Sequence, residues 1–262
     1  MKPTPKPTAP AVNFDAIPAE LAALPQWVVW RYLWKNDSAK WDKVPYDPVL
    51  KPDAETGGRR HHSASSTDPT TWGTLEAAQT AYQSGRGGFA GVGLVFAAGG
   101  GLTGVDLDGC IHPETGEVSD WAHPWLDAFT TYQEISPSGT GVKLFCRGAK
   151  PDGAGCKKAL PFPAVGGKDA AVEAYDRARF FTVTGRTFGK VRPVAECQGA
   201  VDALCNEYFA PNKTARFGHA RRLARRQQCF PWRFPGSACG RRAGLHRRIG
   251  AKRRQGRRHR WW

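Results

Sequence analysis

The stretch Gly104-Val105-Asp106-Leu107-Asp108-Gly109 places two carboxylates two residues apart, with an apolar residue between them. In a β-strand, alternation puts Asp106 and Asp108 on one face and Val105 and Leu107 on the other. Two carboxylates this close repel each other unless a cation lies between them, so the pattern suits a divalent metal ion. Taken alone, the pattern also fits a turn with two solvated aspartates.

A second polar stretch is Ser136-Pro137-Ser138-Gly139-Thr140-Gly141-Val142-Lys143. Its glycines let the backbone approach a ligand closely, its hydroxyls and amides can surround a phosphate, and its lysine adds a positive charge that we expect to face solvent. We therefore expect a triphosphate to be bound by Ser138, Gly139, Thr140 and Lys143. The alternative is a serine- and glycine-rich hairpin with an exposed lysine and no ligand.

Glu173 is a lone acid in an apolar run and is followed by Arg177 and Arg179. Its alternative interpretation is a surface acid paired with a nearby arginine. Three carboxylates can hold two divalent ions, and two metals about 3.5–4 Å apart stabilise the attacking and leaving oxygens of an in-line displacement. Asp106, Asp108 and Glu173 are therefore the candidate catalytic residues and ligands of Mg²⁺ or Mn²⁺, for nucleotidyl transfer. Arg177 or Arg179 would steady the third acid or contact phosphate.

A mixed α/β domain must position these residues. Runs rich in β-branched and aromatic residues predict strands at 27–34, 91–96, 132–136, 142–147, 171–175 and 179–185. Apolar residues at helical spacing predict helices at 17–24, 67–85, 118–131 and 193–208. A glycine-rich turn predicts an antiparallel hairpin between strand 91–96 and the aspartate strand. The expected fold is α+β, with a largely antiparallel mixed sheet and flanking helices.

The positive charge is concentrated at the end of the chain. The net charge is +15, but 17 of the 38 Lys and Arg residues, and none of the 23 Asp and Glu residues, follow residue 210. The first 210 residues therefore hold 21 basic and 23 acidic residues. One explanation of this basic, low-complexity tail is contact with nucleic acid or another polyanion. The other, which we prefer, is out-of-frame translation of a GC-rich gene. Both explanations predict that residues 210–262 are unfolded.

The remaining composition bounds the protein class. Residues 1–16 begin with a proline-rich stretch and predict a disordered leader, which leaves 17–209 as the catalytic domain. The sequence has no secretory signal and no apolar run of membrane-spanning length. Its seven cysteines form no C-x-x-C pair and suggest no disulfide framework. We therefore expect a cytoplasmic protein.

Seven stretches together carry a family resemblance: PQWVVWRY (25–32), KVPYDP (43–48), STDPTTWGTLEAA (66–78), GVGLVF (91–96), GVDLDGCIHPETGEV (104–118), EISPSGTGVKLFCRG (134–148) and VEAYDRARFFTVTG (172–185). Through them, residues 17–209 resemble the N-terminal domain of bifunctional DNA primase/polymerases, in the archaeo-eukaryotic primase superfamily. The resemblance is to the type found in phages, plasmids and bacteria.

The resemblance implies a fold with an RRM-like catalytic half. It places the first acidic motif at Asp106 and Asp108, the second motif at 138–143, and the third at Glu173. Lys143 stands where the superfamily has a histidine that contacts the incoming nucleotide, and Glu173 stands in place of an aspartate. A lysine can still bind phosphate, and a glutamate can still bind metal.

The implied activity is primer synthesis or DNA polymerisation on a single-stranded DNA template from nucleoside triphosphates, in the replication of phage, plasmid or mobile-element DNA. The sequence has no G-x-x-x-x-G-K-[ST] motif, so we expect any helicase to act in trans. The alternative is a non-catalytic, nucleic-acid-binding remnant of such a domain, which the lysine at position 143 favours. A metal-dependent nuclease is a third hypothesis, which the serine- and glycine-rich turn disfavours.

Overall fold

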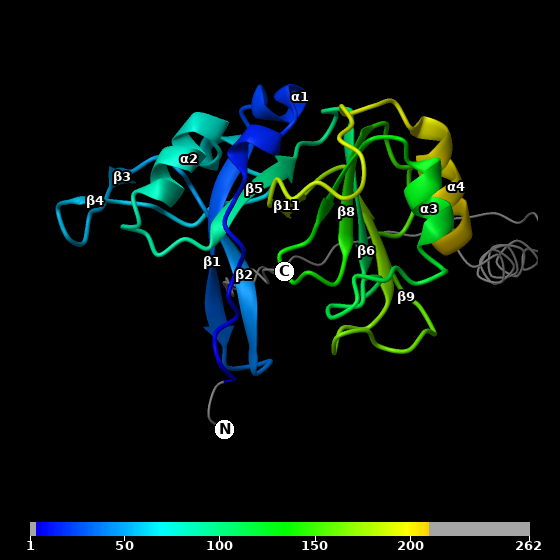
Figure 1. The fold of residues 1–262 in the computed structure, drawn as a ribbon. Coiled ribbons are helices and arrows are strands. Elements are labelled where there is room, and N and C mark those ends of the chain that lie inside the picture. Colours follow the sequence, from blue (N-terminus) through cyan, green and yellow to red (C-terminus); the bar gives the residue numbers. More distant parts are fainter. Residues whose placement is uncertain (1–3, 210–262) are drawn as a thin grey trace, which may run out of the picture. The chain divides into compact units, whose positions relative to one another are not determined.

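A computed structural model describes residues 4–209 of the chain, and the tail predicted over 210–262 lies outside them. The fold is mixed α/β with antiparallel sheets, as the sequence predicts (Figure 1). One sheet has the strand order β11-β5-β1-β2, formed by Arg179–Val183, Gly91–Phe96, Trp27–Lys35 and Lys40–Tyr46. The other has the order β7-β8-β6-β10-β9, formed by Tyr132–Ile135, Val142–Arg147, Leu102–Asp108, Ala171–Tyr175 and Lys157–Ala159.

The four-stranded sheet is covered on one face by the two N-terminal helices, α1 (Ala19–Ala22) and α2 (Leu75–Gln83) (Figure 1). Alternation along the strands directs one set of apolar side chains to this face. Val29 of β1 and Leu94 of β5 are fully buried there, in one cluster with Leu21 of α1 and Ala78 of α2. This burial fixes the sheet's orientation under the helices.

The predicted hairpin between β5 and β6 is wrong. Strand β5 pairs with β1 on one side and with β11 on the other, so neither of its edges is free for β6. The chain instead turns at residues 97–101 and enters the second sheet, where β6 pairs with β8 and β10. The single expected sheet is therefore divided into two.

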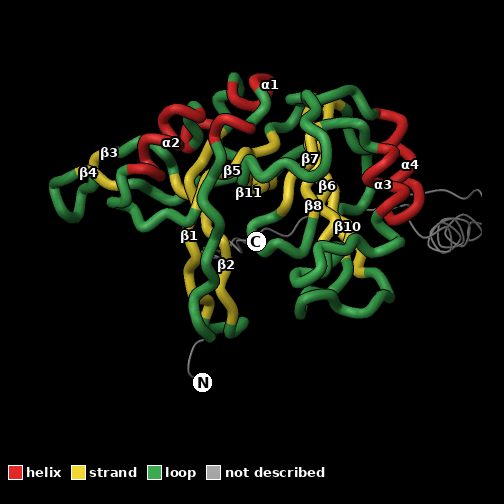
Figure 2. The backbone as a smooth tube through the Cα atoms, viewed as in Figure 1, coloured by secondary structure: helices red, strands yellow, loops and turns green. Residues whose placement is uncertain are grey.

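In the five-stranded sheet, the apolar face packs on the C-terminal helices α3 (His123–Ala128) and α4 (Gln198–Tyr208), which are red in Figure 2. Val105 and Leu107 of β6 are fully buried on this face, together with Leu144 of β8 and Val172 of β10. Alternation then directs the intervening polar residues of the same strands to the opposite face.

Aromatic side chains pack where the two sheets meet. Phe96 and Phe181 of the four-stranded sheet lie with ring centroids 4.9 Å apart, and Phe145 of β8 lies 6.2 Å from Phe96 and 6.0 Å from Phe181. Beneath them, a Cβ atom on Gly104 would lie 2.1 Å from Cζ of Phe96. Only glycine at this position of β6 lets the phenylalanine rings lie directly on the backbone.

All four predicted helices are shorter in the structure, and the one predicted at 17–24 is reduced to α1. In place of one helix over 67–85, a 3-10 helix at Pro69–Thr71 is followed by an extended segment and then by α2. The break arises because Gly73 pairs with Trp27 through two backbone hydrogen bonds of 2.9 Å. The helices predicted at 118–131 and 193–208 shorten to α3 and α4.

The predicted disordered leader is structured at its end. The amide of Asn13 donates to the carbonyl of Thr184 at 2.9 Å, and Phe14–Ala16 form a 3-10 helix. The side chain of Phe14 packs against the core of the four-stranded sheet. An apolar contact and a backbone hydrogen bond therefore hold residues 13–16 on the domain.

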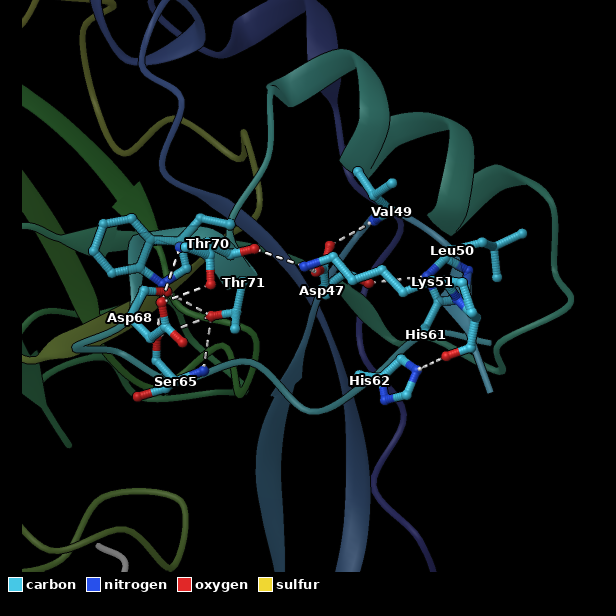
Figure 3. Close-up of polar contacts among 12 residues, drawn as sticks. Asp47, Val49, Leu50, Lys51, His61, His62, Ser65, Asp68, Thr70 and Thr71 are labelled. Carbon is cyan, nitrogen blue, oxygen red and sulfur yellow. Dashed lines mark hydrogen bonds and ion pairs between the residues drawn. The ribbon is translucent and has the colours of Figure 1, made fainter. Parts of the chain in front are cut away.

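The segment between β2 and α2 contains the short hairpin of β3 (Lys51–Pro52) and β4 (Arg59–Arg60). Figure 3 shows the polar contacts that order it. The buried carboxylate of Asp47 accepts from the amide of Val49 at 2.8 Å and pairs with Lys51 at 2.6 Å. Lys51 also donates to the carbonyl of Thr70 at 2.6 Å.

Among residues 4–209, none of the helices is both long and apolar enough to span a bilayer.

Candidate functional site

One residue from each strand of the five-stranded sheet forms a row of ionisable side chains, which we call the ionisable row. Across the sheet, the register pairs Glu134 with Lys143, Lys143 with Asp106, Asp106 with Glu173, and Glu173 with Lys157. Residues directly opposite each other in antiparallel strands point to the same face. The ionisable row therefore lies on the face opposite the apolar core of α3 and α4.

The predicted acids Asp106, Asp108 and Glu173 share this face. Asp106 and Glu173 are direct partners across β6 and β10, although 66 residues separate them in the chain. Asp108 lies two residues further along β6, opposite Ala171. Glu173 therefore lies on the same side of the sheet as Asp106 and Asp108, as a shared site requires. Their roles in metal binding and catalysis stay predictions.

Lys143 is buried and forms an ion pair with Asp106, which corrects the expectation that its side chain faces solvent. Its ammonium also lies 4.3 Å from the ring centroid of Phe181, in a cation–π contact. Burial raises the pKa of Asp106 above its ordinary value; the charge of Lys143 opposes this shift, and Asp108 and Glu173 add to it. The lysine in the histidine position thus serves, in this structure, as the counter-ion of a buried acid.

Glu173 is buried and is held by three neighbours. Its carboxylate pairs with Lys157 at 2.5 Å and with Arg179 at 3.5 Å, and accepts from the hydroxyl of Tyr175 at 3.0 Å. Burial acts to raise the pKa of Glu173, but Lys157 and the other neighbours outweigh it, so the net pKa lies below the ordinary value. Arg177 instead pairs with Asp176 at 3.0 Å, so Arg179 is the arginine that contacts the third acid.

The carboxylate oxygens of the three acids are suitable ligands for a divalent cation, although each acid is paired with a lysine of the protein. Oδ1 of Asp106 is buried and has no hydrogen-bond partner among the described residues, which is the state expected of a ligand oxygen. Asp108 pairs with Lys168 at 3.5 Å. Within residues 4–209, no three His, Cys, Asp or Glu side chains are grouped closely enough to hold a metal. Metal ligation by these acids would therefore require the lysines to release them.

The predicted phosphate turn connects β7 and β8 and lies beside the end of β6. A Cβ atom on Gly141 would lie 2.8 Å from the carbonyl oxygen of Leu107, and the carbonyl of Thr140 accepts from the amides of Cys110 and Ile111 at 2.9 and 3.0 Å. The fold therefore places the turn close to Asp108.

Within the turn, Gly139 has a φ of 77°, which suits glycine. The hydroxyl of Ser138 is hydrogen-bonded to those of Ser136 and Thr140, at 3.0 and 2.9 Å. The three hydroxyls thus form a chain along the turn, as donors and acceptors that a phosphate could use. Phosphate binding by Ser138, Gly139 and Thr140 stays a prediction.

Glu134 is the acid of the ionisable row that the sequence analysis missed. It is fully buried and accepts from the hydroxyl of Tyr132 at 2.9 Å and from the amides of Thr184 and Gly185 at 3.0 Å. Burial raises the pKa of Glu134 to about 7, although these hydrogen bonds and Lys143 oppose the shift. Because β7 and the end of β11 belong to different sheets, Glu134 joins them. The sequence pattern that could have indicated Glu134, an acid within a predicted strand, is the pattern that indicated Glu173.

Lys157 and Lys168 were also missed, for a different reason. Both belong to the segment between β8 and β10, where the sequence shows no periodic pattern. The sheet register places Lys157 opposite Glu173, and an ion pair joins Lys168 to Asp108. Charged residues in such a segment look like ordinary solvated lysines. Only the fold shows that they neutralise the carboxylates of Glu173 and Asp108.

Comparisons with known proteins give one informative match. The chain is similar to a protein named DNA primase-polymerase from Nitratiruptor phage NrS-1, with 32% identity over 168 residues. The match covers 64% of this chain and 20% of that relative, so the chain spans about a fifth of the relative's length. No family model matches the chain. The match agrees with the resemblance to primase-polymerase domains carried by the seven sequence motifs.

Proposed function

We propose that this domain catalyses metal-dependent nucleotidyl transfer, as primer synthesis or DNA polymerisation, on a single-stranded DNA template with nucleoside triphosphates. The observation that supports the proposal is the direct pairing of Asp106 with Glu173 in a row flanked by lysines. The name of the phage relative supports the same class of activity. Replication of phage, plasmid or mobile-element DNA is the proposed setting, with any helicase acting in trans.

Asp106, Asp108 and Glu173 are the residues that would hold Mg²⁺ or Mn²⁺. When bound, such an ion supplies positive charge that stabilises the attacking and leaving oxygens of an in-line displacement. The carboxylates must be ionised to act as ligands, and Glu173, with its lowered pKa, is the acid best prepared for this. Burial raises the pKa of Asp106, and the charge of Lys143 opposes this shift, so Lys143 favours the ionised form that a ligand needs.

The phosphates of the substrate are assigned to Lys143, Arg179 and the turn with Ser138, Gly139 and Thr140. In the present arrangement Lys143 and Arg179 pair with carboxylates. A triphosphate offers these side chains alternative oxygens, with charge-assisted hydrogen bonds of comparable strength. The cations would thus neutralise the acids in the resting site and the phosphates in the loaded site.

A non-catalytic remnant that only binds nucleic acid is the second candidate. The pairing of Lys143 with Asp106 favours it, because the acid is already neutralised by a residue of the protein. The ion pairs of Glu173 with Lys157 and of Asp108 with Lys168 favour it as well, because these acids also have cations of the protein as partners. In this case single-stranded DNA would bind, but no nucleotide would be incorporated.

The test is incorporation of labelled ribo- or deoxynucleotides on a single-stranded DNA template with Mg²⁺ or Mn²⁺. Asp108→Asn is the informative variant, because Asp108 is only half-buried and its loss threatens the fold least. The matched control is Asp127→Asn, which changes an exposed acid of α3 outside the site. We expect activity in the parent and the control and at least a hundredfold loss in Asp108→Asn. A parent that binds template but incorporates nothing would support the remnant instead.

A further inference from the structure

Strand β2 of the four-stranded sheet brings a fifth cation to the site. Lys43, opposite Tyr32 in the β1–β2 register, has its ammonium 5.6 Å from the ring centroid of Trp30. Burial lowers the pKa of Lys43 to about 8; Lys143 adds to this effect, while Asp106 and Asp108 oppose it. Because these partners all belong to the five-stranded sheet, Lys43 reaches the candidate site from the other sheet.

Lys43 differs from the other cations of the site in having no carboxylate partner. Lys143 pairs with Asp106, Lys157 and Arg179 with Glu173, and Lys168 with Asp108. Within the part of the chain that the structure describes, no carboxylate lies within ion-pair distance of the Lys43 ammonium. The site therefore holds five cations against four acids, Glu134 included, and the charge of Lys43 is partly removed from water.

An ammonium placed in this way favours an anionic ligand, because desolvation of a charge is costly unless a counter-ion compensates it. Asp108, beside which the serine- and glycine-rich turn packs, is one of the charged groups that act on the pKa of Lys43. An anion between Lys43 and this turn would be contacted from both sheets. A triphosphate carries enough charge and length for both sets of contacts.

We propose that Lys43 is a phosphate ligand for the nucleoside triphosphate, supplied by the four-stranded sheet, so that the bound substrate bridges the two sheets. This inference rests on the proposed function, because it concerns the same substrate. It adds a residue that neither the acidic motifs nor the phosphate turn includes. It also assigns a role to the K-V-P-Y-D-P stretch, in which Lys43 is the first residue.

The experiment measures binding of a non-hydrolysable nucleoside triphosphate analogue in the presence of Mn²⁺, by titration calorimetry. Lys43→Met and Lys43→Gln remove the charge, and Lys43→Arg retains it. The control is Lys35→Met, an exposed lysine at the end of β1 in the same hairpin. We expect at least tenfold weaker binding for both neutral variants, partial recovery with arginine, and no change in the control.

Two further measurements separate ligand binding from a structural effect. The loss should be larger for the triphosphate than for the monophosphate of the same nucleoside, because fewer phosphates contact the lysine in the monophosphate. Affinity for a single-stranded DNA oligonucleotide should stay unchanged. If neutral variants bind the triphosphate as tightly as the parent, or lose DNA binding instead, the assignment of Lys43 is overturned. A parent that binds no triphosphate would overturn the proposed function itself.

Discussion

Asp106 and Glu173 face each other directly on β6 and β10, yet each carboxylate is paired with a lysine from the strand on its outer side. Lys143 of β8 holds the first and Lys157 of β9 holds the second. Each of two adjacent buried acids thereby has a cation of the protein beside it, although burial still raises the pKa of Asp106. This arrangement determines both the stability of the resting domain and the conditions under which ligands can bind.

Loss of the Lys143 charge is expected to destabilise the domain. Lys143→Met leaves Asp106 buried without its counter-ion, which costs on the order of 3 kcal/mol in free energy of unfolding near neutral pH. Asp106→Asn should be destabilising for the converse reason, since it leaves a buried ammonium unpaired. The double variant should recover most of the loss, because a neutral pair requires no compensation. Urea unfolding of the four proteins measures the coupling.

The matched control for this cycle is Lys168→Met with Asp108→Asn. Lys168 is exposed and its pair with Asp108 is longer, at 3.5 Å, so these changes should alter stability by less than about 1 kcal/mol. If Lys143→Met proves as harmless as Lys168→Met, the ion pair with Asp106 does not contribute to folding.

Glu134 should make stability depend on pH. Its folded pKa of about 7 lies above the ordinary 4.5, so the folded state binds this proton more tightly than the unfolded chain does. Its contribution to stability is therefore fully present below about pH 4.5 and is lost as the pH rises through about 7. The slope reaches at most about 1.4 kcal/mol per pH unit.

Glu134→Gln provides the test of this titration. Unfolding free energies of the parent and the variant are measured in urea at pH 5, 6, 7 and 8. Other groups titrate alike in both proteins, so the difference between the two curves isolates Glu134. We expect the variant to gain relative to the parent as the pH rises. Parallel curves would show that Glu134 does not titrate in this range.

Metal and nucleotide are expected to bind cooperatively. Mn²⁺ alone must compete with Lys143, Lys157 and Lys168 for the acids, whereas a triphosphate gives these lysines other partners. Calorimetric titration should therefore show at least tenfold tighter Mn²⁺ binding with a non-hydrolysable triphosphate than without it, after correction for Mn²⁺ bound by free nucleotide. Lys168→Met should strengthen binding of Mn²⁺ alone. Equal Mn²⁺ affinities with and without nucleotide would contradict this coupling.

The sequence was sufficient for those features that depend on local pattern. Alternation in β6 placed Asp106 and Asp108 on one face, and the apolar run around Glu173 predicted a strand. The error in strand pairing concerns information that lies outside any one segment. A short turn after β5 favours a hairpin locally, but β1 and β11 already occupy both edges of that strand.

Three lysines of the candidate site could not be predicted for the same reason. Lys157 and Lys168 come from a segment without periodicity, and Lys43 comes from the other sheet. Lys143 was recognised, but its environment was not, because burial by Phe181 depends on how the two sheets pack. Residue type and spacing thus indicated the acids and the arginine beside Glu173, whereas tertiary structure alone showed which lysines pair with the acids.

Gly104→Ala tests the packing between the sheets. A Cβ atom at this position would lie 2.1 Å from Phe96 and 2.6 Å from Phe181, so both rings must move within a packed core. We expect a loss of about 1–3 kcal/mol in the free energy of unfolding. Gly199→Ala in α4 is the control, because nothing lies within 4 Å of its Cβ position and helix propensity favours alanine by up to about 1 kcal/mol.

Gly104→Ala should also affect ligand binding at the candidate functional site. Phe181 contacts the ammonium of Lys143, and Gly104 lies two residues before Asp106 on the same face of β6. Displacement of the Phe181 ring should therefore weaken triphosphate binding in Gly104→Ala, while Gly199→Ala binds as the parent does. Nucleotide titration under conditions where both variants stay folded measures this. If Gly104→Ala is destabilised but its triphosphate affinity is unchanged, the packing of Phe96 and Phe181 on Gly104 contributes to stability and not to ligand binding.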